Sequence, residues 1–581
     1  MIIAVKNPAG RKDIAFETFF VLMADLRSVR ITYTLHVSQK KCKPLVKDAW
    51  MWDNFFVNKK EIEKILKDKR GFPHRVRYLK LKETYISWLI FTGDIVYKIK
   101  KPVRFSYLDF STLKKRKFFL TQELKLNQRL AREVYLDVVP IAVKNNRLRF
   151  LEKSDSPLLK DEKIKDYALK MKEIPQRYYA PSLLERGYLK KEVLGKLAKI
   201  IADFHKRAKT SKEIEKYGRL KIIRKNWEEN FKQTKPFVGK AINKTIFVFI
   251  KKEIRRFLKE NRTLFEKRIR EKKIRDCHGD FHTGNIFISP KKIFIIDCLE
   301  FNKRFRYQDT AADTAFLAMD LEYLKRPDLS DYFVKKYAAR SRDKDLFKIL
   351  PFYKCYRAYV RAKVGCFSLP KGDILSIKRY FSLSFRYALS LKNRSPFMLI
   401  ICGQIGTGKT HLAEYLSLIT GAYLLRSDVL RKKMLGIPLF SHPKKNIKKI
   451  YGERTTERIY KKMGSEALKR LKRGRPVILD ATFSKEKHRK KIRGAAERSG
   501  FPYLFVECYA PEKKILARLK QRAKKKEISD ATVEVYLKRK QEFEKIKLKK
   551  RFLKLNTQGN NVEQKANRVL EKLLSLDAKS I

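Results

Sequence analysis

Acidic residues are scarce in this chain of 581 residues, which carries 62 Asp and Glu against 139 Lys and Arg and has a formal net charge of +77. Polycationic ligands are disfavoured by this balance, because like charges repel. The excess favours an anionic partner, such as nucleic acid, a phosphorylated substrate or an anionic membrane. Because the basic residues are spread along the whole sequence, the same composition is equally typical of ordinary solvated basic faces.

Cysteine pairs and long apolar runs are also missing. The seven cysteines include no CxxC pair and follow no regular spacing, which excludes a disulfide or zinc framework and favours reduced thiols. No apolar run approaches the roughly 18–20 residues of a membrane span. The first residues lack the layout of a signal peptide. We therefore predict a cytoplasmic protein.

Hydrophobic periodicity divides the chain into two halves. Before about residue 390 it predicts helices at 59–71, 113–132, 194–207, 247–270 and 349–364, and strands at 76–81, 86–91, 95–99 and 138–143, with a strand-rich island at 285–297. After residue 396 strands and helices alternate, which predicts a parallel sheet covered by helices. The strands are expected at 397–402, 422–426, 476–480 and 503–508, and the helices at 409–419, 453–473, 485–498 and 511–522.

The first 57 residues are poorly patterned. Val57, just before Asn58, could be a GTG initiation codon read as valine. We expect residues 1–56 to be absent from the natural protein, or disordered when present. The aromatic residues Trp50, Trp52, Phe55 and Phe56 argue the other way, because such a cluster can bury a useful area.

A specific motif follows the first strand of the second half. The P-loop pattern G-x-x-x-x-G-K-[ST] is matched in full by Gly403, Gln404, Ile405, Gly406, Thr407, Gly408, Lys409 and Thr410. The glycines let backbone N–H groups close around phosphates at the start of a helix. The lysine would neutralise β- and γ-phosphate charge, and the threonine hydroxyl would hold Mg²⁺. ATP and Mg²⁺ are therefore the predicted cofactors.

Further charged residues narrow the subclass. Asp428 follows the second strand of this half, where parallel sheets bind ligands, and Asp480 ends another strand and could order Mg²⁺. Arg518 and Arg522 lie four apart on one helix and precede the basic stretch 524–526, which suits a lid over transferring phosphate. The alternatives are a helix N-cap for Asp428 and a solvated helix face for the two arginines.

The region 397–545 resembles the small P-loop kinases of the polynucleotide-kinase and zeta-toxin-like group, in which an Asp-x-x-Arg pair follows the second strand. The resemblance implies that Asp428 is a general base toward a hydroxyl and that Arg431 is its substrate-side partner. A carboxylate beside an arginine suits a hydroxyl acceptor that carries an anionic group. Nucleic acid is slightly favoured over sugar nucleotides.

The first half carries a second set of chemical residues. Asp280 and Asn285, in the sequence Cys277-His-Gly-Asp-Phe-His-Thr-Gly-Asn, keep the spacing of a kinase catalytic loop, and Asp297 occupies the place of its metal-binding carboxylate. This predicts one carboxylate that deprotonates a hydroxyl, with an amide and a second carboxylate holding Mg²⁺. Lys98 is the predicted phosphate-binding lysine, with Glu123 as its partner. Lys100 points to the same face and stays an alternative.

This half resembles the aminoglycoside and choline kinase-like family, and the chain from about 60 to 545 resembles bacterial two-domain proteins in which such a domain is fused to an ATP-binding domain. The matching sequence segments include Tyr97-Lys-Ile-Lys-Lys-Pro102, Asp297-Cys-Leu-Glu-Phe-Asn302 and Met319-Asp-Leu-Glu322. Two departures are Tyr85, where that group usually has His, and the lack of an obvious glycine-rich loop. ATP and Mg²⁺ use is implied, but antibiotic resistance is not.

We therefore predict an α+β kinase-like bilobal domain followed by an α/β P-loop domain with a parallel sheet. The expected segments are 1–57 (the extension), 58–145 (small lobe), 146–392 (large lobe) and 393–581 (P-loop kinase or ATPase). The predicted function is ATP-dependent phosphotransfer at two nucleotide sites, each acting on a hydroxyl. The alternatives are a nucleic-acid-binding regulatory ATPase, and a protein in which one half is degenerate and acts as a scaffold or sensor.

Overall fold

The computed structural model describes residues 2–6, 12–16, 56–105, 108–144, 147–152, 163–369, 373–392, 396–441, 450–523, 528–548 and 550–576. The chain divides into two compact units. The first contains Met1–Asn226 and Asn261–Arg357, and the second contains Trp227–Glu260 and Ala358–Ile581. Two of the three cuts fall inside the helices α6 (Leu220–Thr234) and α12 (Leu346–Phe367), and the third lies between Glu260 and Asn261. The domain boundaries expected from the sequence stay a prediction beside this grouping.

The first unit contains an antiparallel sheet of six strands in the order β3-β4-β5-β10-β8-β9. Helix α1 (Lys59–Ile65) precedes it, and α2 (Leu113–Ala131) packs against β8 and β10. Two strands of this sheet, β9 and β10, were not predicted from the sequence. The strands are β3 (Lys80–Glu83), β4 (Ser87–Phe91), β5 (Ile95–Lys100), β8 (Tyr135–Lys144), β9 (Arg147–Phe150) and β10 (Lys163–Lys172).

The alternation of strand β5 decides where its lysines go. Tyr97 and Ile99 are fully buried in a core with β4 and β8, whereas Val96 packs on the opposite face with Leu120 of α2. Because successive strand side chains point to opposite faces, Lys98 and Lys100 share the face of Val96. The sequence pattern of β5 therefore directs both lysines toward helix α2.

Helices and short strands make up the rest of the first unit. The expected helix at 247–270 is two helices, α7 (Lys244–Glu260) and α8 (Arg262–Arg270), which fall in different units. The strand-rich island is a hairpin of β12 (Ile286–Ile288) and β13 (Ile293–Ile295). The other elements are β6 (Arg104–Phe105), β7 (Leu108–Asp109), β11 (Ile274–Asp276), β14 (Tyr307–Asp309), α3 (Ala180–Glu185), α4 (Lys191–Arg207), α5 (Lys212–Glu215), α8 (Arg262–Arg270), α9 (Lys303–Arg306), α10 (Thr310–Tyr323) and α11 (Pro327–Ser341).

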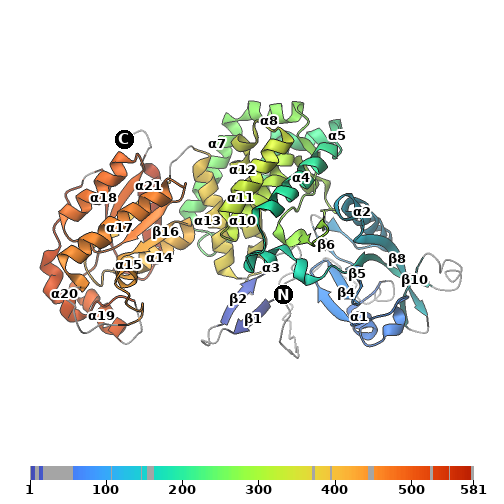
Figure 1. Ribbon diagram of the computed structural model, residues 1–581, viewed down its shortest axis with the longest axis horizontal. Helices are drawn as coiled ribbons and strands as arrows, with labels where there is room; N and C mark the ends of the chain where they lie inside the picture. The colour runs from blue at the N-terminus through green and yellow to red at the C-terminus, as the bar shows by residue number, and fades with distance from the viewer. Residues whose placement is uncertain are drawn as a thin grey trace. The chain divides into compact units, whose positions relative to one another are not determined.

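A parallel sheet of five strands forms the centre of the second unit, in the order β16-β17-β15-β18-β19. This confirms the predicted parallel sheet after residue 396, and helices flank it in Figure 1. The strands are β15 (Met398–Cys402), β16 (Tyr423–Arg426), β17 (Val477–Asp480), β18 (Tyr503–Tyr509) and β19 (Phe552–Asn556). The helices are α7 (Lys244–Glu260), α13 (Ile374–Ser390), α14 (Lys409–Thr420), α15 (Ser427–Met434), α17 (Glu453–Leu471), α18 (Glu486–Arg498), α19 (Glu512–Ala523), α20 (Val533–Arg539) and α21 (Val562–Ser575).

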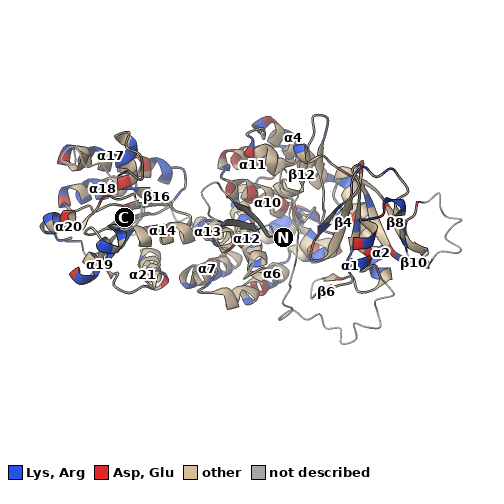
Figure 2. Ribbon diagram, turned by 90° about the horizontal axis from the view of Figure 1, so that it is seen from below, with Lys and Arg blue, Asp and Glu red and all other residues tan. Residues whose placement is uncertain are grey.

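Two further expectations meet the structure only in part. Of residues 1–56, the structure describes the antiparallel pair β1 (Ile2–Lys6) and β2 (Lys12–Phe16) and the final Phe56, so the expected start near Val57 stays a prediction. Among the described residues, no helix combines the length and the apolar character needed to cross a bilayer. Lys and Arg occur on helices and strands throughout both units (Figure 2).

Candidate functional site

The P-loop joins the end of β15 to the start of α14. Gly403 has φ +133°, and a Cβ at this position would lie 2.2 Å from the carbonyl oxygen of Cys508. Gly408 also has a positive φ and stands directly before Lys409, the first residue of α14. Only glycine relieves both constraints, so the backbone can turn closely around a ligand at the positive end of the helix.

The charged residues of this loop contact one another. Lys409 donates from Nζ to the carbonyl oxygen of Gln404 at 2.6 Å, so the ammonium lies across the loop. Burial lowers the pKa of this lysine. The Thr410 hydroxyl donates to Oδ2 of Asp480 at 2.7 Å, and burial raises the pKa of that carboxyl. The sheet therefore brings together the two residues that the sequence predicted for Mg²⁺, from positions 70 residues apart.

Asp428 and Arg431 are neighbours on the short helix α15. Their contact joins Asp428 Oδ1 and Arg431 Nη1 at 3.1 Å. Asp428 lies in the first turn and is not the N-cap residue, which is Arg426. The Arg431 side chain is 6% exposed, and its guanidinium lies over the Tyr451 ring, 4.6 Å from the centroid. Its Nε is buried and has no hydrogen-bond partner among the described residues, so the group retains a donor for an anion.

Arg518 and Arg522 are not on a fully solvated face of α19. Arg518 donates from Nη1 to the Thr557 hydroxyl at 3.3 Å, and a Cβ at Gly408 would lie 3.2 Å from the same Nη1. Arg518 therefore lies beside the P-loop. Arg522 donates to Ser529 Oγ at 3.0 Å. The predicted lid residues Lys524, Lys525 and Lys526 lie outside the described residues.

The first unit brings Lys98 to two carboxylates. Its Nζ lies 2.6 Å from Glu123 Oε1 and 3.0 Å from Asp297 Oδ1. Burial opposes the charge, but Asp297 and Glu123 outweigh it and raise the pKa of this lysine well above its usual value. Lys100 reaches the other oxygen of Glu123 at 2.8 Å and is fully buried. A ligand therefore meets Lys98, whose side chain is 13% exposed, rather than Lys100.

The predicted catalytic loop is closed by hydrogen bonds. The amide of Asn285 donates to the backbone oxygen of Asp280 at 2.9 Å and to its Oδ2 at 3.0 Å. His282 Nε2 lies 3.4 Å from the same carboxylate oxygen, while its Nδ1 accepts from the N–H of Gly284. Asp297 follows the hairpin of β12 and β13 in a left-handed conformation, with φ +61°. Its N–H donates to the hydroxyl of Tyr135 at 3.0 Å, which fixes this unusual backbone.

Asp313 of α10 anchors the predicted catalytic loop, and this contact was not predicted from the sequence. Its two oxygens accept from the N–H groups of His278 at 2.7 Å and Gly279 at 2.9 Å. His205 of α4 contacts Asp313 at 3.3 Å and the Tyr337 hydroxyl at 2.8 Å. A buried acid in an apolar helix is the only sequence signal for this anchor, and it does not name the partner.

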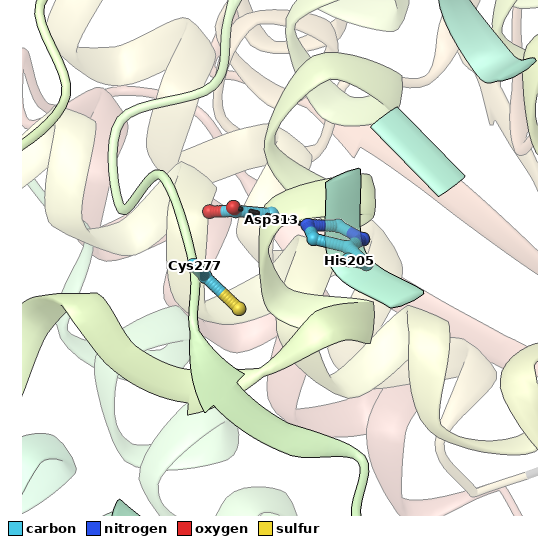
Figure 3. A group of neighbouring side chains, drawn as sticks. All are labelled: His205, Cys277 and Asp313. Carbon is cyan, nitrogen blue, oxygen red and sulfur yellow. Dashed lines mark hydrogen bonds and ion pairs between the residues drawn. The ribbon is translucent and has the colours of Figure 1, made fainter. Parts of the chain in front are cut away.

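Cys277, at the end of β11, joins His205 and Asp313 in a buried cluster (Figure 3). These residue types can bind a metal. Here the Cys277 thiol donates to the carbonyl oxygen of Gln308, and burial raises its pKa, so it stays protonated. Both nitrogens of His205 already have partners. The cluster therefore positions the loop and is not offered as a metal centre.

Asn285 provides a test of whether Mg²⁺ fits the first unit. Its Oδ1 is buried and has no hydrogen-bond partner among the described residues, while its amide is held by Asp280. The N–H of Ile296, next to Asp297, donates to the backbone oxygen of Asn285 at 2.9 Å, so both metal-binding candidates lie on paired segments. Amide and carboxylate oxygens are ligands that Mg²⁺ prefers. These residues fit the ion.

A third acidic group, Glu453 and Glu457 with His488, could also share a cation. The ammonium of Lys487 contacts Glu453 and lies 3.1 Å from Glu457. A lysine therefore already occupies the position of a cation there, and we assign no metal to this group.

Comparison with known proteins agrees with the architecture of the second unit. Residues 398–546 match the family model described as an AAA domain. The matched residues contain the P-loop and the strands β15, β16, β17 and β18 of the parallel sheet. Uncharacterized proteins of Mycobacterium bovis and Mycobacterium tuberculosis are 28% identical to this chain over 462 residues, which cover 79% of it and 89% of each relative.

Solved kinase structures are also similar to part of the chain. A gluconokinase from Sinorhizobium meliloti 1021 is 18% identical, with a TM-score of 0.24, and the match covers 31% of this chain and 93% of that one. The Mycobacterium tuberculosis APS kinase in complex with AMPPNP and APS is 19% identical, with a TM-score of 0.25, over 31% and 99%. These low scores give no argument about the substrate of this chain.

Proposed function

We propose that this chain is an ATP-dependent phosphotransferase with two nucleotide sites, one in each unit, each transferring a γ-phosphoryl group to a hydroxyl. The observation that carries the proposal beyond the P-loop is the position of Lys98 between Glu123 and Asp297, in a unit that contains no part of the P-loop. A pure binding module has no need for such a set together with Asp280 and Asn285. The resemblance of this half to aminoglycoside and choline kinase-like proteins supports the same assignment.

In the first unit, Asp280 would accept the proton of the acceptor hydroxyl. Asn285 holds this carboxylate through its amide, and its free oxygen would hold Mg²⁺ together with Asp297. Lys98 would leave Asp297 and bind the nucleotide phosphates, with Glu123 keeping it in place. When bound, Mg²⁺ neutralises the charge that develops on the phosphates. All of these groups are buried or nearly so, which strengthens their electrostatic effects.

In the second unit, the P-loop would bind the triphosphate, and Thr410 with Asp480 would hold Mg²⁺. Asp428 would act as the base and Arg431 would bind an anion on the acceptor. A 5′-hydroxyl nucleic acid fits this pair slightly better than a sugar nucleotide or a phosphorylated sugar, given the charge of +77. A cationic aminoglycoside fits it poorly.

Transfer from γ-labelled ATP tests this proposal. We would offer the full chain 5′-hydroxyl oligonucleotides, phosphorylated and plain sugars, and aminoglycosides, and repeat each assay with Asp280→Asn and Asp428→Asn. Each variant should lose transfer to one class of acceptor and keep the other. ATP turnover without labelled product would overturn the kinase assignment in favour of an ATPase. If Asp280→Asn keeps transfer to every acceptor, the result would favour a degenerate first unit.

A further inference from the structure

Two lysines and three carboxylates form one continuous chain of ion pairs in the first unit. Asp297 contacts Lys98 at 3.0 Å, and Lys98 contacts Glu123 at 2.6 Å. The other oxygen of Glu123 contacts Lys100 at 2.8 Å, and Lys100 contacts Glu300 at 2.6 Å. Negative and positive groups therefore alternate from the loop after β13, across the face of β5 and α2, and back to the same loop.

Exposure falls along this chain. The Asp297 and Lys98 side chains are 12% and 13% exposed, Glu123 and Lys100 are 0% exposed, and Glu300 is 6% exposed. The ring of Phe110 lies 4.6 Å from Lys100 Nζ and covers that end. Among the described members of this network, Lys98 and Asp297 are therefore the most accessible to a ligand, and Lys100 and Glu300 act through Glu123.

Burial of Lys100 and Glu300 has an electrostatic cost, and a purely structural role does not explain why the fold retains this pair. Burying a lysine and a carboxylate removes both from water, and apolar residues of similar size often stabilise a core as well or better. In this network, Lys100 contacts one carboxylate oxygen of Glu123 and Lys98 contacts the other, so the two lysines share the negative charge of Glu123. Glu300 in turn takes part of the charge of Lys100. The balance between these pairs sets how much of the Lys98 charge remains for another anion.

We propose that Lys100 and Glu300 are a positioning pair that sets how firmly Glu123 holds Lys98, and thereby the affinity of the first unit for Mg-ATP. The proposal rests on the proposed function of this site. It assigns opposite signs to the two residues. When the negative charge of Glu300 is removed, Lys100 pairs with Glu123 alone and neutralises more of its charge. Glu123 then holds Lys98 less firmly, and Lys98 is more available to phosphate. Removing the positive charge of Lys100 leaves Lys98 as the only lysine of the network that pairs with Glu123. Glu123 then holds Lys98 more firmly, and Lys98 is less available to phosphate.

The test uses the full chain with Lys409→Ala, so that only the first site contributes, and measures Mg-ATP affinity by titration. Glu300→Gln should bind about threefold more tightly and Lys100→Met about tenfold more weakly, since one unit of nearby charge has effects of this order at a partly screened site. Because Glu300 acts through Lys100, the double variant should bind about as weakly as Lys100→Met, which is a non-additive result. If Lys100→Met does not fold, the Mg-ATP affinities of Glu300→Gln and of the double variant test the proposal.

A matched control separates positioning from stability. Arg116 of α2 and Asp166 of β10 form a buried ion pair in the same unit, 3.0 Å apart and each 1% exposed, outside the proposed site. Asp166→Asn should lower the melting temperature and leave Mg-ATP affinity unchanged. Unchanged or weaker binding by Glu300→Gln overturns the positioning pair. Undiminished binding by Lys98→Met in the same background instead overturns the nucleotide site itself.

Discussion

The two candidate nucleotide sites use different parts of the protein to bind phosphate. In the second unit, the candidate site is a P-loop of eight consecutive residues whose backbone would bind phosphate, and a Cβ at Gly403 would collide with the carbonyl oxygen of Cys508. In the first unit, side chains from distant segments converge, with Lys98 meeting Glu123 and Asp297, 199 residues further along. One site is built from local backbone, the other from a buried network of charges.

This difference predicts how each site responds to substitution. A backbone site tolerates side-chain changes outside its glycines, lysine and hydroxyl, because the N–H donors remain. A side-chain network is coupled, and changing one member alters the charge felt by the others. We therefore expect single substitutions to have additive effects in the second unit and non-additive effects in the first.

The largest expected effect is loss of phosphoryl transfer when a base is removed. Asp280→Asn should reduce transfer by the first unit about 1000-fold, since a positioned base contributes on the order of 10²–10⁴. Mg-ATP affinity should change little, because Asp280 faces the acceptor. Asp297→Asn should instead weaken Mg-ATP binding itself. Equal effects of both changes on binding would show that the two roles are misassigned.

Acid should weaken the first unit through the catalytic loop. His278 is fully buried, and burial lowers its pKa from 6.5 to about 4. A folded pKa below the unfolded one means that the unfolded chain binds more protons between these values. Stability is therefore complete above about pH 6.5 and is lost as pH falls toward 4, by about 3 kcal/mol in total.

Hydrogen exchange of peptides covering residues 274–288 checks this prediction. After correction for the intrinsic exchange rate, protection should fall between pH 7 and pH 5 in the wild type. In His278→Asn the loss should be much smaller, because the titrating group is gone. Equal losses in the two proteins would assign the acid sensitivity to another group.

The second site could be predicted from the sequence far better than the first. Its motif is contiguous, and each strand that frames it is an apolar run, so Thr410 and Asp480 could both be named. Their contact at 2.7 Å follows from neighbouring parallel strands. The role of Asp428 stays a prediction, although the structure places it beside Arg431.

The first site could be named in part, because the spacing of Asp280, Asn285 and Asp297 along the sequence matches that of a kinase catalytic loop and its metal-binding carboxylate. Its supports could not be predicted. Asp313 lies in a helix and Glu300 in a loop, and neither belongs to a recognisable motif. Only the fold brings Asp313 to His278 and Glu300 to Lys100. Strand β10 was missed as well, because a register shift between Ile164 and Asp166 and the run Tyr167-Ala168-Leu169 interrupt its polar–apolar alternation.

Nucleotide binding should separate the two units cleanly. Lys98→Met and Lys409→Ala should each remove about one nucleotide per chain and weaken the affected site about 100-fold, since a charge-assisted hydrogen bond contributes roughly 1.5–3 kcal/mol and each lysine makes more than a single contact with phosphate. The double variant should bind none. Calorimetric titration with Mg-ATP gives both stoichiometry and affinity. A single site in the wild type would remove the two-site proposal.

The smallest expected effect concerns the acceptor of the second unit. Arg431→Lys keeps a positive charge but loses the planar group that lies over Tyr451 and the Nε donor that has no partner among the described residues. Lysine cannot bind an anion through two parallel hydrogen bonds, so the KM for an anionic acceptor should rise about tenfold. The KM for ATP and transfer by the first unit should stay unchanged, because neither involves this residue. Steady-state labelling of a 5′-hydroxyl oligonucleotide measures the two KM values, and labelling of the acceptor class that Asp280→Asn loses measures transfer by the first unit. The salt concentration is kept fixed because nonspecific binding by a chain of charge +77 depends steeply on ionic strength. A rise in the KM for ATP instead would place Arg431 on the nucleotide side of the P-loop.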